Sequence, residues 1–303
     1  MSQPTRIADL SYRNYDGPKT LSATRWWSIT KNGLRMNIRK KNFWTLAIFC
    51  ALPYLIMVIN LFFTQTIREF QRIKIPLEAT FAQYYGGSFV VFLVMFFAML
   101  VGAGSIAADN RANALQIYLS KAITKFDYLV GKWLSIFIPV YAVVFLPAFL
   151  AITYAALDQG VVEFFKQHPT LHLKLFLLAA IPAAFHASML CGISAWNKTP
   201  WVVGVIYIAL VFFTDAAVNI VADVVDMSDP QAFTLRHLSL LGILSGLGYH
   251  VIGSAPAEFD FRSGLEIPSL PEFPPLFAVY IVCIVVSLLL AFSRIRAVEV
   301  VQG

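Results

Sequence analysis

Charged and polar side chains gather in one segment, 106–132, that lies between two long apolar stretches of the chain. Asp109 and Arg111 stand at its start, and Leu115 and Tyr118 follow at spacings of four and three residues. An acid in the first turn complements a helix dipole, and apolar residues three or four positions apart share one helical face. The pattern predicts a short amphipathic helix that binds a partner. A helix that packs on the membrane surface or on neighbouring spans would show the same pattern.

The composition places the chain among polytopic membrane proteins. Of its 303 residues, 58% are hydrophobic and 13% are charged, whereas soluble domains hold about 25% charged residues. About 20 apolar residues in a helix cross a hydrocarbon core of roughly 30 Å, and in lipid each segment must satisfy its own backbone hydrogen bonds. We therefore expect an all-α membrane protein with six transmembrane helices, at 43–63, 86–108, 133–157, 171–195, 200–222 and 275–293.

The distribution of basic residues predicts the orientation of the chain. An even number of spans puts both termini on one side, and 16 of the 23 Lys and Arg residues fall on that side. Because a basic excess marks the cytoplasmic side, we expect a multi-pass protein of the inner (cytoplasmic) membrane with cytoplasmic N- and C-termini. The net charge of +6 then reflects topology and does not call for a nucleic-acid partner. The three cysteines have no metal-binding spacing, so no metal site is expected.

The N-terminal part divides into a tail and a helix. Residues 1–21 are polar and are expected to form a cytoplasmic tail. In 22–41 an apolar face opposes a basic one, with Ile29 and Met36 out of pattern, which predicts an amphipathic helix in the membrane interface. A soluble helix packed on a partner is the alternative. The interface residues would be Trp26, Trp27, Arg35, Arg39, Lys40 and Lys41. Residues 42–303 are expected to form a single six-span transmembrane domain.

Two loops differ in character. Residues 196–200 are too few for more than a tight cytoplasmic turn, which predicts that spans 4 and 5 form an antiparallel hairpin. The largest external loop is 223–274, whose middle part is apolar but interrupted by glycines and followed by prolines. We expect one or two short helices there, lying on or dipping into the outer leaflet, rather than a seventh span.

Span 5 carries the polar residues Thr214, Asp215 and Asn219. A carboxylate inside a span is costly and usually faces a cavity or a partner, and Asp215 and Asn219 share a helical face at a spacing of four residues. These residues predict a polar wall of a substrate path. The alternative is that Asp215 reaches water at the outer end of the span.

The polar segment resembles the first cytoplasmic loop of ABC-2-type permeases, the membrane subunits of exporter-like ABC transporters. The resemblance rests on an acid, a basic residue, spaced leucines, a Ser-Lys pair and a Gly-Lys entering span 3, here Asp109, Arg111, Leu115, Leu119-Ser120-Lys121 and Gly131-Lys132. The chain departs from the family pattern at Ala112-Asn113, Gln116 and Ala122. The six spans, the interfacial helix and the loop before span 6 are also similar to that family.

The resemblance implies a permease subunit that is not itself an enzyme. A separate ABC ATP-binding subunit would bind ATP and Mg, leaving no cofactor in this chain, and a second permease, identical or related, would complete the transporter. The 109–121 helix would be the cytoplasmic coupling helix, contacting the ATPase through Asp109, Arg111, Asn113, Leu115, Gln116, Tyr118, Leu119, Ser120 and Lys121. Membrane lipids would surround the spans, whose few polar groups suit a lipid-like or amphipathic cargo. An ion-coupled secondary carrier or a channel subunit without an ATPase partner is the alternative.

Overall fold

The computed structural model describes residues 24–71, 77–119, 123–224, 238–254, 258–260, 265–267 and 272–295. The predicted tail, 1–21, lies outside these residues, as do Ser120 and Lys121 of the predicted partner site. The helices and strands, in chain order, are α1 (Arg25–Ile38), α2 (Lys41–Gln71), α3 (Leu77–Gly86), α4 (Ser88–Gly102), α5 (Ala107–Arg111), α6 (Ala114–Leu119), α7 (Lys125–Gln159), α8 (Val161–Gln167), α9 (Leu171–Ala195), α10 (Pro200–Val224), α12 (Leu240–Ile252), β1 (Glu258–Asp260), β2 (Leu265–Ile267) and α13 (Phe273–Arg294).

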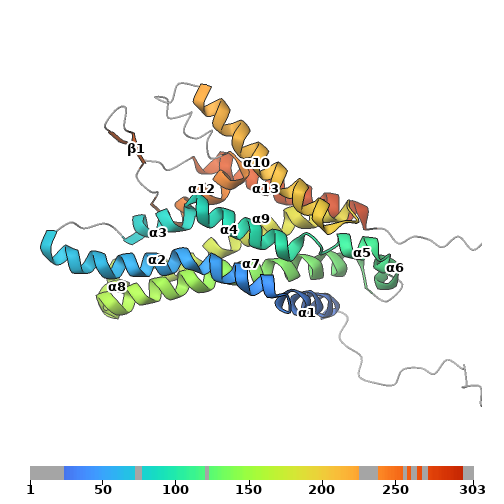
Figure 1. The fold of residues 1–303 in the computed structure, drawn as a ribbon, viewed down its shortest axis with the longest axis horizontal. Coiled ribbons are helices and arrows are strands. Elements are labelled where there is room, and N and C mark those ends of the chain that lie inside the picture. Colours follow the sequence, from blue (N-terminus) through green and yellow to red (C-terminus); the bar gives the residue numbers. More distant parts are fainter. Residues whose placement is uncertain are drawn as a thin grey trace, which may run out of the picture.

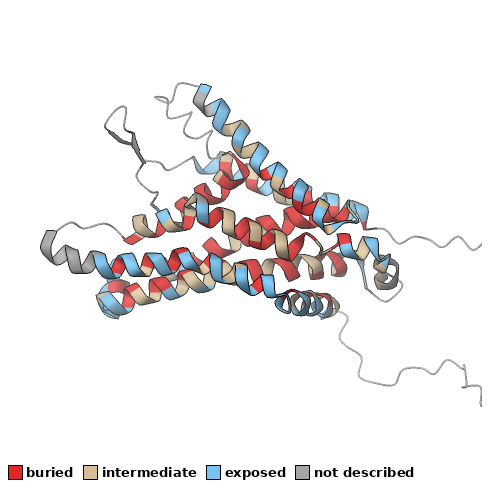
Figure 2. Cartoon of the chain, viewed as in Figure 1, coloured by how far each residue is buried: buried red, intermediate tan, exposed pale blue. Residues whose placement is uncertain are grey.

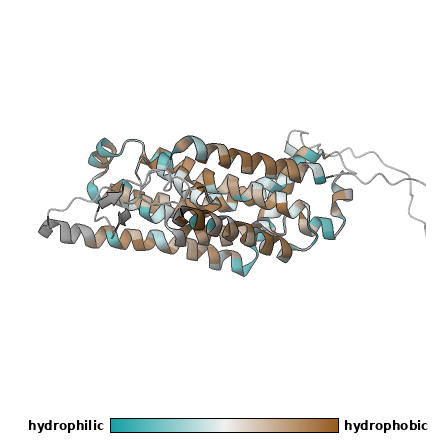
Figure 3. Ribbon diagram, turned by 90° about the horizontal axis from the view of Figure 1, so that it is seen from above, coloured by the Kyte–Doolittle hydropathy of each residue, from teal (hydrophilic) through white to brown (hydrophobic). Residues whose placement is uncertain are grey.

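Six helical segments of the described chain are long and apolar enough to cross a membrane, which confirms the predicted six-span α-helical fold. They are Lys41–Phe63, Phe89–Arg111, Lys125–Gln159, Leu171–Ala195, Pro200–Val221 and Phe273–Arg294. Apolar residues dominate the middle of the long helices, and hydrophilic residues gather nearer both ends (Figure 3). The chain is therefore a multi-pass membrane protein.

The long helices run side by side, so that the bundle has two distinct ends (Figure 1). One end carries α1, α5, α6, the turn between α9 and α10, and the last turn of α13; we call it the α6 end. The other carries α3, α8 and α12, and we call it the α3 end. The tight turn between α9 and α10 confirms the predicted antiparallel hairpin, although α10 diverges from the bundle along its length (Figure 1).

The centre of the bundle is α9. Of an 18-residue apolar stretch of α9, 67% is buried, against 22% for the corresponding stretches of α10 and α13. Buried residues also concentrate around α9 in Figure 2. Pro182 lies within α9, and a proline inside a helix leaves the carbonyl four residues earlier without its N–H donor. The Tyr85 hydroxyl donates to that carbonyl, Leu178 O, at 2.8 Å. The Tyr280 hydroxyl donates to Ile181 O at 3.1 Å.

Helix α1 packs on α7 rather than standing free. Ile29 and Thr30 are buried, and the Thr30 hydroxyl donates to Gly131 O at 3.2 Å. A Cβ at Gly131 would lie 2.7 Å from Ile29 Cβ, so the absence of a side chain permits this approach. Ile29, which falls outside the two-faced pattern in the sequence, thus packs against α7. The exposed Trp27 lies on the other side of the helix, where a membrane could contact it.

The predicted external loop contains one described helix, α12, and a two-stranded hairpin that the sequence did not predict. The strands β1 and β2 pair antiparallel, with Glu258 opposite Ile267. Ser239 caps α12 by accepting from Gly242 N at 2.9 Å, and α12 ends at Gly253 in the left-handed region, at φ 83°. Lys174 of α9 donates to Ile252 O at 2.8 Å, which satisfies a terminal carbonyl of α12.

Candidate partner-binding site

The polar segment folds as two short helices, α5 and α6, and not as the single helix that was predicted. The break falls at Ala112–Asn113, where Asn113 has a φ of 52°. Asparagine tolerates this left-handed conformation better than most residues. The break turns α6 relative to α5 at the extreme α6 end of the bundle (Figure 1).

Asp109 points into the protein and anchors α5 to α7. Its Oδ2 lies 2.7 Å from Lys132 Nζ, and the two side chains are only 17% and 13% exposed. The Tyr128 hydroxyl donates to the same oxygen at 2.7 Å. Removing two charges from water is costly unless they pair and form further hydrogen bonds. The arrangement meets that condition, so Asp109 and Lys132 hold the start of the segment against the third span.

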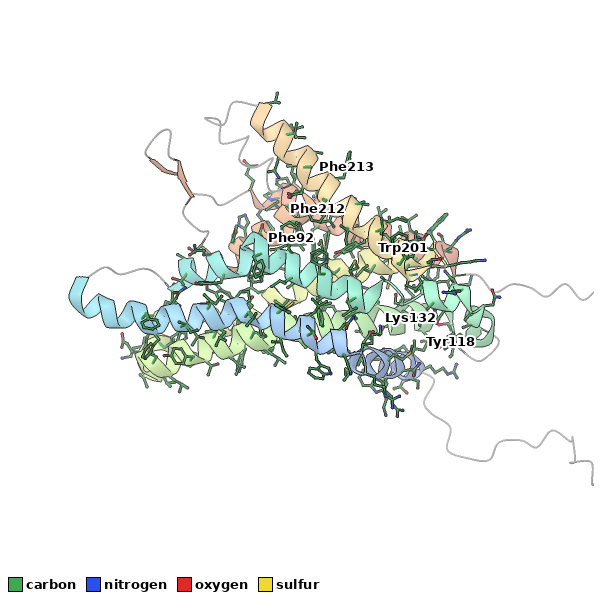
Figure 4. The ribbon with its side chains drawn as sticks, in the orientation of Figure 1. Phe92, Tyr118, Lys132, Trp201, Phe212 and Phe213 are labelled. Carbon is green, nitrogen blue, oxygen red and sulfur yellow. The ribbon has the colours of Figure 1, made fainter. Side chains whose placement is uncertain are left out.

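Tyr118 extends this cluster from α6. Its ring centroid is 5.4 Å from that of Tyr128, and Lys132 Nζ lies 6.0 Å from the Tyr118 centroid; Figure 4 shows Tyr118 and Lys132 together at this end. Burial, and then the negative charge of Asp109, raise the pKa of the Tyr118 phenol. The phenol therefore stays neutral at physiological pH, and both helices of the segment are tied to α7.

A second set of contacts anchors α5 to the end of α9. Ser194 Oγ accepts from Ile106 N at 3.1 Å and from Ala107 N at 2.8 Å, and it donates to Ala103 O at 3.0 Å. Asn110 Nδ2 donates to Ala195 O and to Asn197 O, at 2.9 and 3.1 Å. Ser194 and Asn110 are not identifiable from the sequence, because a serine or asparagine that binds a distant backbone leaves no periodic pattern.

The start of α7 is also fixed locally. Thr124 and Asp127 form a capping box, in which the Thr124 hydroxyl accepts from Asp127 N at 3.1 Å and Asp127 Oδ2 accepts from Thr124 N at 3.1 Å. This reciprocal pairing satisfies two donors at the helix start. It explains why α7 begins at Lys125, eight residues before the predicted span.

The surface left open by these anchors is a small polar rim. Ala108, Arg111, Ala112 and Asn113 are exposed, and Leu115 is half-buried. The backbone of Gln116 and Leu119 belongs to α6, but their side chains lie outside the described part. Of the predicted contact residues, the structure thus places Arg111 and Asn113 on the surface and turns Asp109 inward.

The junction between α1 and α2 holds the predicted interface residue Lys40. Its Nζ donates to Asn37 Oδ1 at 2.9 Å, and Asn37 Nδ2 donates to Val101 O at 3.4 Å. Lys40 is exposed overall, and partial burial of its amine lowers the pKa of that group. Of the other predicted interface residues, Trp26 is half-buried, whereas a further set is exposed: Trp27, Arg35, Arg39 and Lys41.

The polar residues predicted to line a substrate path bond within α10. The Thr214 hydroxyl donates to Val211 O at 2.9 Å, and Asn219 Nδ2 donates to Asp215 O at 2.9 Å and to Asp215 Oδ2 at 3.2 Å. Aromatic stacking of Phe92 on Phe212, with centroids 5.3 Å apart, joins α10 to α4 (Figure 4). The structure does not bring Asp215 near the partner site, and the substrate path stays a prediction.

No group of three His, Cys, Asp or Glu side chains that could hold a metal ion occurs within the described residues. The polar groups at the α6 end instead anchor α5 and α6 to α7 and α9.

Comparison with known proteins agrees with this arrangement. A search of curated proteins finds no match. The family model described as "ABC-2 family transporter protein" matches residues 27–298, which spans every described helix except the first two residues of α1. The chain therefore belongs to the ABC-2 transporter family, as a multi-pass membrane protein of that family.

Proposed function

We propose that this chain is the permease subunit of an ABC transporter and that a separate ATPase subunit binds the rim formed by Ala108, Arg111, Ala112 and Asn113. One observation carries the proposal: a small exposed surface is anchored to two different spans. Asp109 ties it to α7 through Lys132, and Ser194 ties it to α9. A surface held in this way can pass the displacement of a bound partner into the bundle.

The anchors determine where such a displacement goes. Because Asp109 and Tyr128 connect α5 to α7, and Ser194 and Asn110 connect it to α9, these two spans would follow the segment. Helix α9 packs against α4, α7, α10, α12 and α13, so its movement would reach every one of those helices. The segment connects spans 2 and 3, and the contacts of Ser194 and Asn110 add span 4 to the helices that would carry the shift.

Several parts of the proposal rest on family membership. ATP and Mg would be bound by the partner chain, and the working transporter would contain two permeases and two ATPases in the inner membrane, with the α6 end and both termini in the cytoplasm. The cargo would be exported, and spans with few polar groups suit a lipid-like or amphipathic cargo. The sparsely buried α10 would face lipid or the second permease, with Asp215 and Asn219 along the substrate path.

The test is reconstitution of the permease with its ATPase in nanodiscs. Arg111→Glu reverses an exposed charge on the rim, so we expect the membrane fold to be unchanged while co-purification of the ATPase and transport-coupled ATP hydrolysis fall about tenfold. The matched control is Lys166→Glu on α8, because Lys166 is 70% exposed and lies at the α3 end. This control should bind the ATPase like the natural chain.

Equal ATPase binding and coupled hydrolysis in the Arg111→Glu and Lys166→Glu proteins would overturn the proposed rim. A native complex that contains no ATPase would overturn the ABC mechanism itself. Transport that then followed an ion gradient would favour the alternative, a secondary carrier.

A further inference from the structure

A small cavity lies within the bundle toward the α3 end, where α2, α4, α7, α9 and α12 meet. Tyr54, Val94, Val144, His186 and Ser245 are among the residues that line it. The cavity leaves about 20 Å³ for the centres of water-sized groups, and one enclosed water needs about 10–15 Å³. The space therefore fits one water molecule or one group of similar size.

Two buried polar atoms on side chains that line this cavity have no hydrogen-bond partner in the described part of the chain. Tyr54 Oη and His186 Nε2 are both shielded from solvent, and neither forms a hydrogen bond with the described residues. Their side chains are almost fully buried, with Tyr54 3% and His186 1% exposed. Buried polar atoms in proteins are nearly always hydrogen-bonded, so two unpaired atoms around one cavity call for an explanation.

The other nitrogen of His186 indicates what its Nε2 requires. His186 Nδ1 lies 2.5 Å from the hydroxyl of the buried Tyr207. If the Tyr207 hydroxyl donates to Nδ1, the neutral ring carries its proton on Nε2. The reverse arrangement would leave the Tyr207 proton without an acceptor among the described residues. The hydrogen-bond network thus assigns Nε2 as a donor that needs an acceptor oxygen.

The remaining residues that line the cavity favour an uncharged ligand. The Tyr54 hydroxyl can donate to the same acceptor. The Ser245 hydroxyl already donates within α12, to Gly242 O at 3.0 Å, and so keeps lone pairs for a further donor. None of the lining residues in the described structure is Lys, Arg, Asp or Glu. An ion would enter this site without a countercharge, which disfavours charged ligands.

We propose that the cavity binds one neutral hydroxyl group, whose oxygen accepts from His186 Nε2 and Tyr54 Oη and whose proton is offered to Ser245 Oγ. The hydroxyl is supplied either by an enclosed water molecule or by the alcohol end of an amphipathic molecule. This site lies within one chain. Its proposed ligand does not depend on ATPase binding at the α6 end, so the two proposals are tested separately.

The walls explain why the cavity does not close by itself. Tyr85 also borders it, and the hydrogen bond to Leu178 O fixes its ring against α9. Gly248 of α12 packs directly on the Tyr85 ring, leaving no room for even a Cβ. These contacts hold the Tyr85 ring and α12 in place. Neither can shift into the cavity without breaking the Tyr85 hydrogen bond or the packing of Gly248 on the ring.

The experiment uses the full chain in lipid nanodiscs, labelled with ¹⁵N-histidine, and measures magnetisation transfer from hydroxyl protons to the Nε2 proton of His186. The resonance is assigned by its loss in His186→Gln. We expect transfer in the natural chain and its loss in Val94→Leu, which adds about one methylene to the cavity wall. Tyr54→Phe should also weaken the transfer without adding volume. Tyr141→Phe removes a hydroxyl from α7 away from the cavity and should change nothing.

A second arm identifies the source of the hydroxyl. The same spectra are recorded in nanodiscs with and without 1-octanol as the probe. Transfer from the methylene protons of 1-octanol to the His186 ring would show that an alcohol enters, whereas transfer from water alone would identify an enclosed water. The proposal is overturned if the natural chain shows no transfer from either source, or if Val94→Leu and Tyr54→Phe both leave the transfer unchanged.

Discussion

The α6 end of the bundle and the contact between α3 and α12 at its other end are held together by different interactions. At the α6 end, charged and polar side chains reach across helices: Asp109 pairs with Lys132, and Ser194 binds the backbone of α5. At the α3 end, α3 and α12 meet by close packing of glycines on tyrosine rings, Gly86 against Tyr249 and Gly248 against Tyr85. Polar anchors fix a segment at named atoms, whereas packing fixes it by volume. The first arrangement suits the surface that we propose to transmit movement.

The largest effect is expected from Asp109→Asn. The change leaves the ammonium of Lys132 buried without its countercharge, and breaking a buried pair in this way costs about 3 kcal/mol. The free energy of unfolding, measured in detergent, should fall by that amount. In the double variant with Lys132→Met the unpaired charge is gone, so more than half of the loss should be recovered. If Asp109→Asn were as stable as the natural chain, the Asp109–Lys132 pair would not be an interaction that stabilises the α6 end.

The next effect is expected at the α3 end, from Gly248→Ala. The new methyl group would overlap the Tyr85 ring, and overpacking of this kind costs about 2 kcal/mol. Thermal unfolding followed by size-exclusion chromatography measures it. The matched control is Gly104→Ala at the α6 end, where a Cβ would make ordinary contact with Pro200 at 3.6 Å. Equal melting temperatures for the two variants would contradict packing as the basis of the contact between α3 and α12.

A smaller effect is expected from Thr124→Val, which removes the capping box at the start of α7. Loss of such a cap costs about 1 kcal/mol. The control is Thr153→Val in the same helix, because the buried Thr153 hydroxyl has no partner in the described structure and its removal should cost nothing. Thr124→Val should therefore lower the free energy of unfolding more than Thr153→Val does. Equal losses, or a larger loss for Thr153→Val, would contradict the role of the capping box.

The smallest effect is a pH dependence at the α6 end. The folded-state pKa of Tyr118 is raised by burial and by Asp109, while an unfolded tyrosine titrates near about 10. The contribution of Tyr118 to stability is therefore complete below about pH 10 and is lost as the pH rises toward the folded pKa. Tyr118→Phe should show a shallower fall in unfolding free energy between about pH 9 and 11. Identical slopes would mean that the cluster does not respond to charge.

The spans could be predicted from the sequence because their signal is local. A run of apolar residues long enough to cross lipid identifies α2, α4, α9, α10 and α13 without knowledge of their neighbours. The start of α7 was missed because Lys125 and Asp127 look like loop residues until their capping contacts are seen.

The internal arrangement of the partner site could not be predicted in the same way. A first-turn acid such as Asp109 has the same sequence pattern whether it faces solvent or Lys132, and the choice is made by α7, 23 residues further along the chain. Ser194 and Asn110 act on backbone atoms more than 80 residues away. The hairpin of β1 and β2 lies in a loop whose apolar and proline-rich pattern masks such short strands.

Two polar contacts at opposite ends of α9 connect the movement of α5 to that of α12. Lys174 holds the last carbonyl of α12, and Ser194 holds the first backbone amides of α5. They are 20 residues apart, about 30 Å along a helix, and two tyrosines brace the proline between them. One helix thus contacts both α5 and α12, and spin labels placed beside these two helices should keep a constant separation while the rest of the bundle moves.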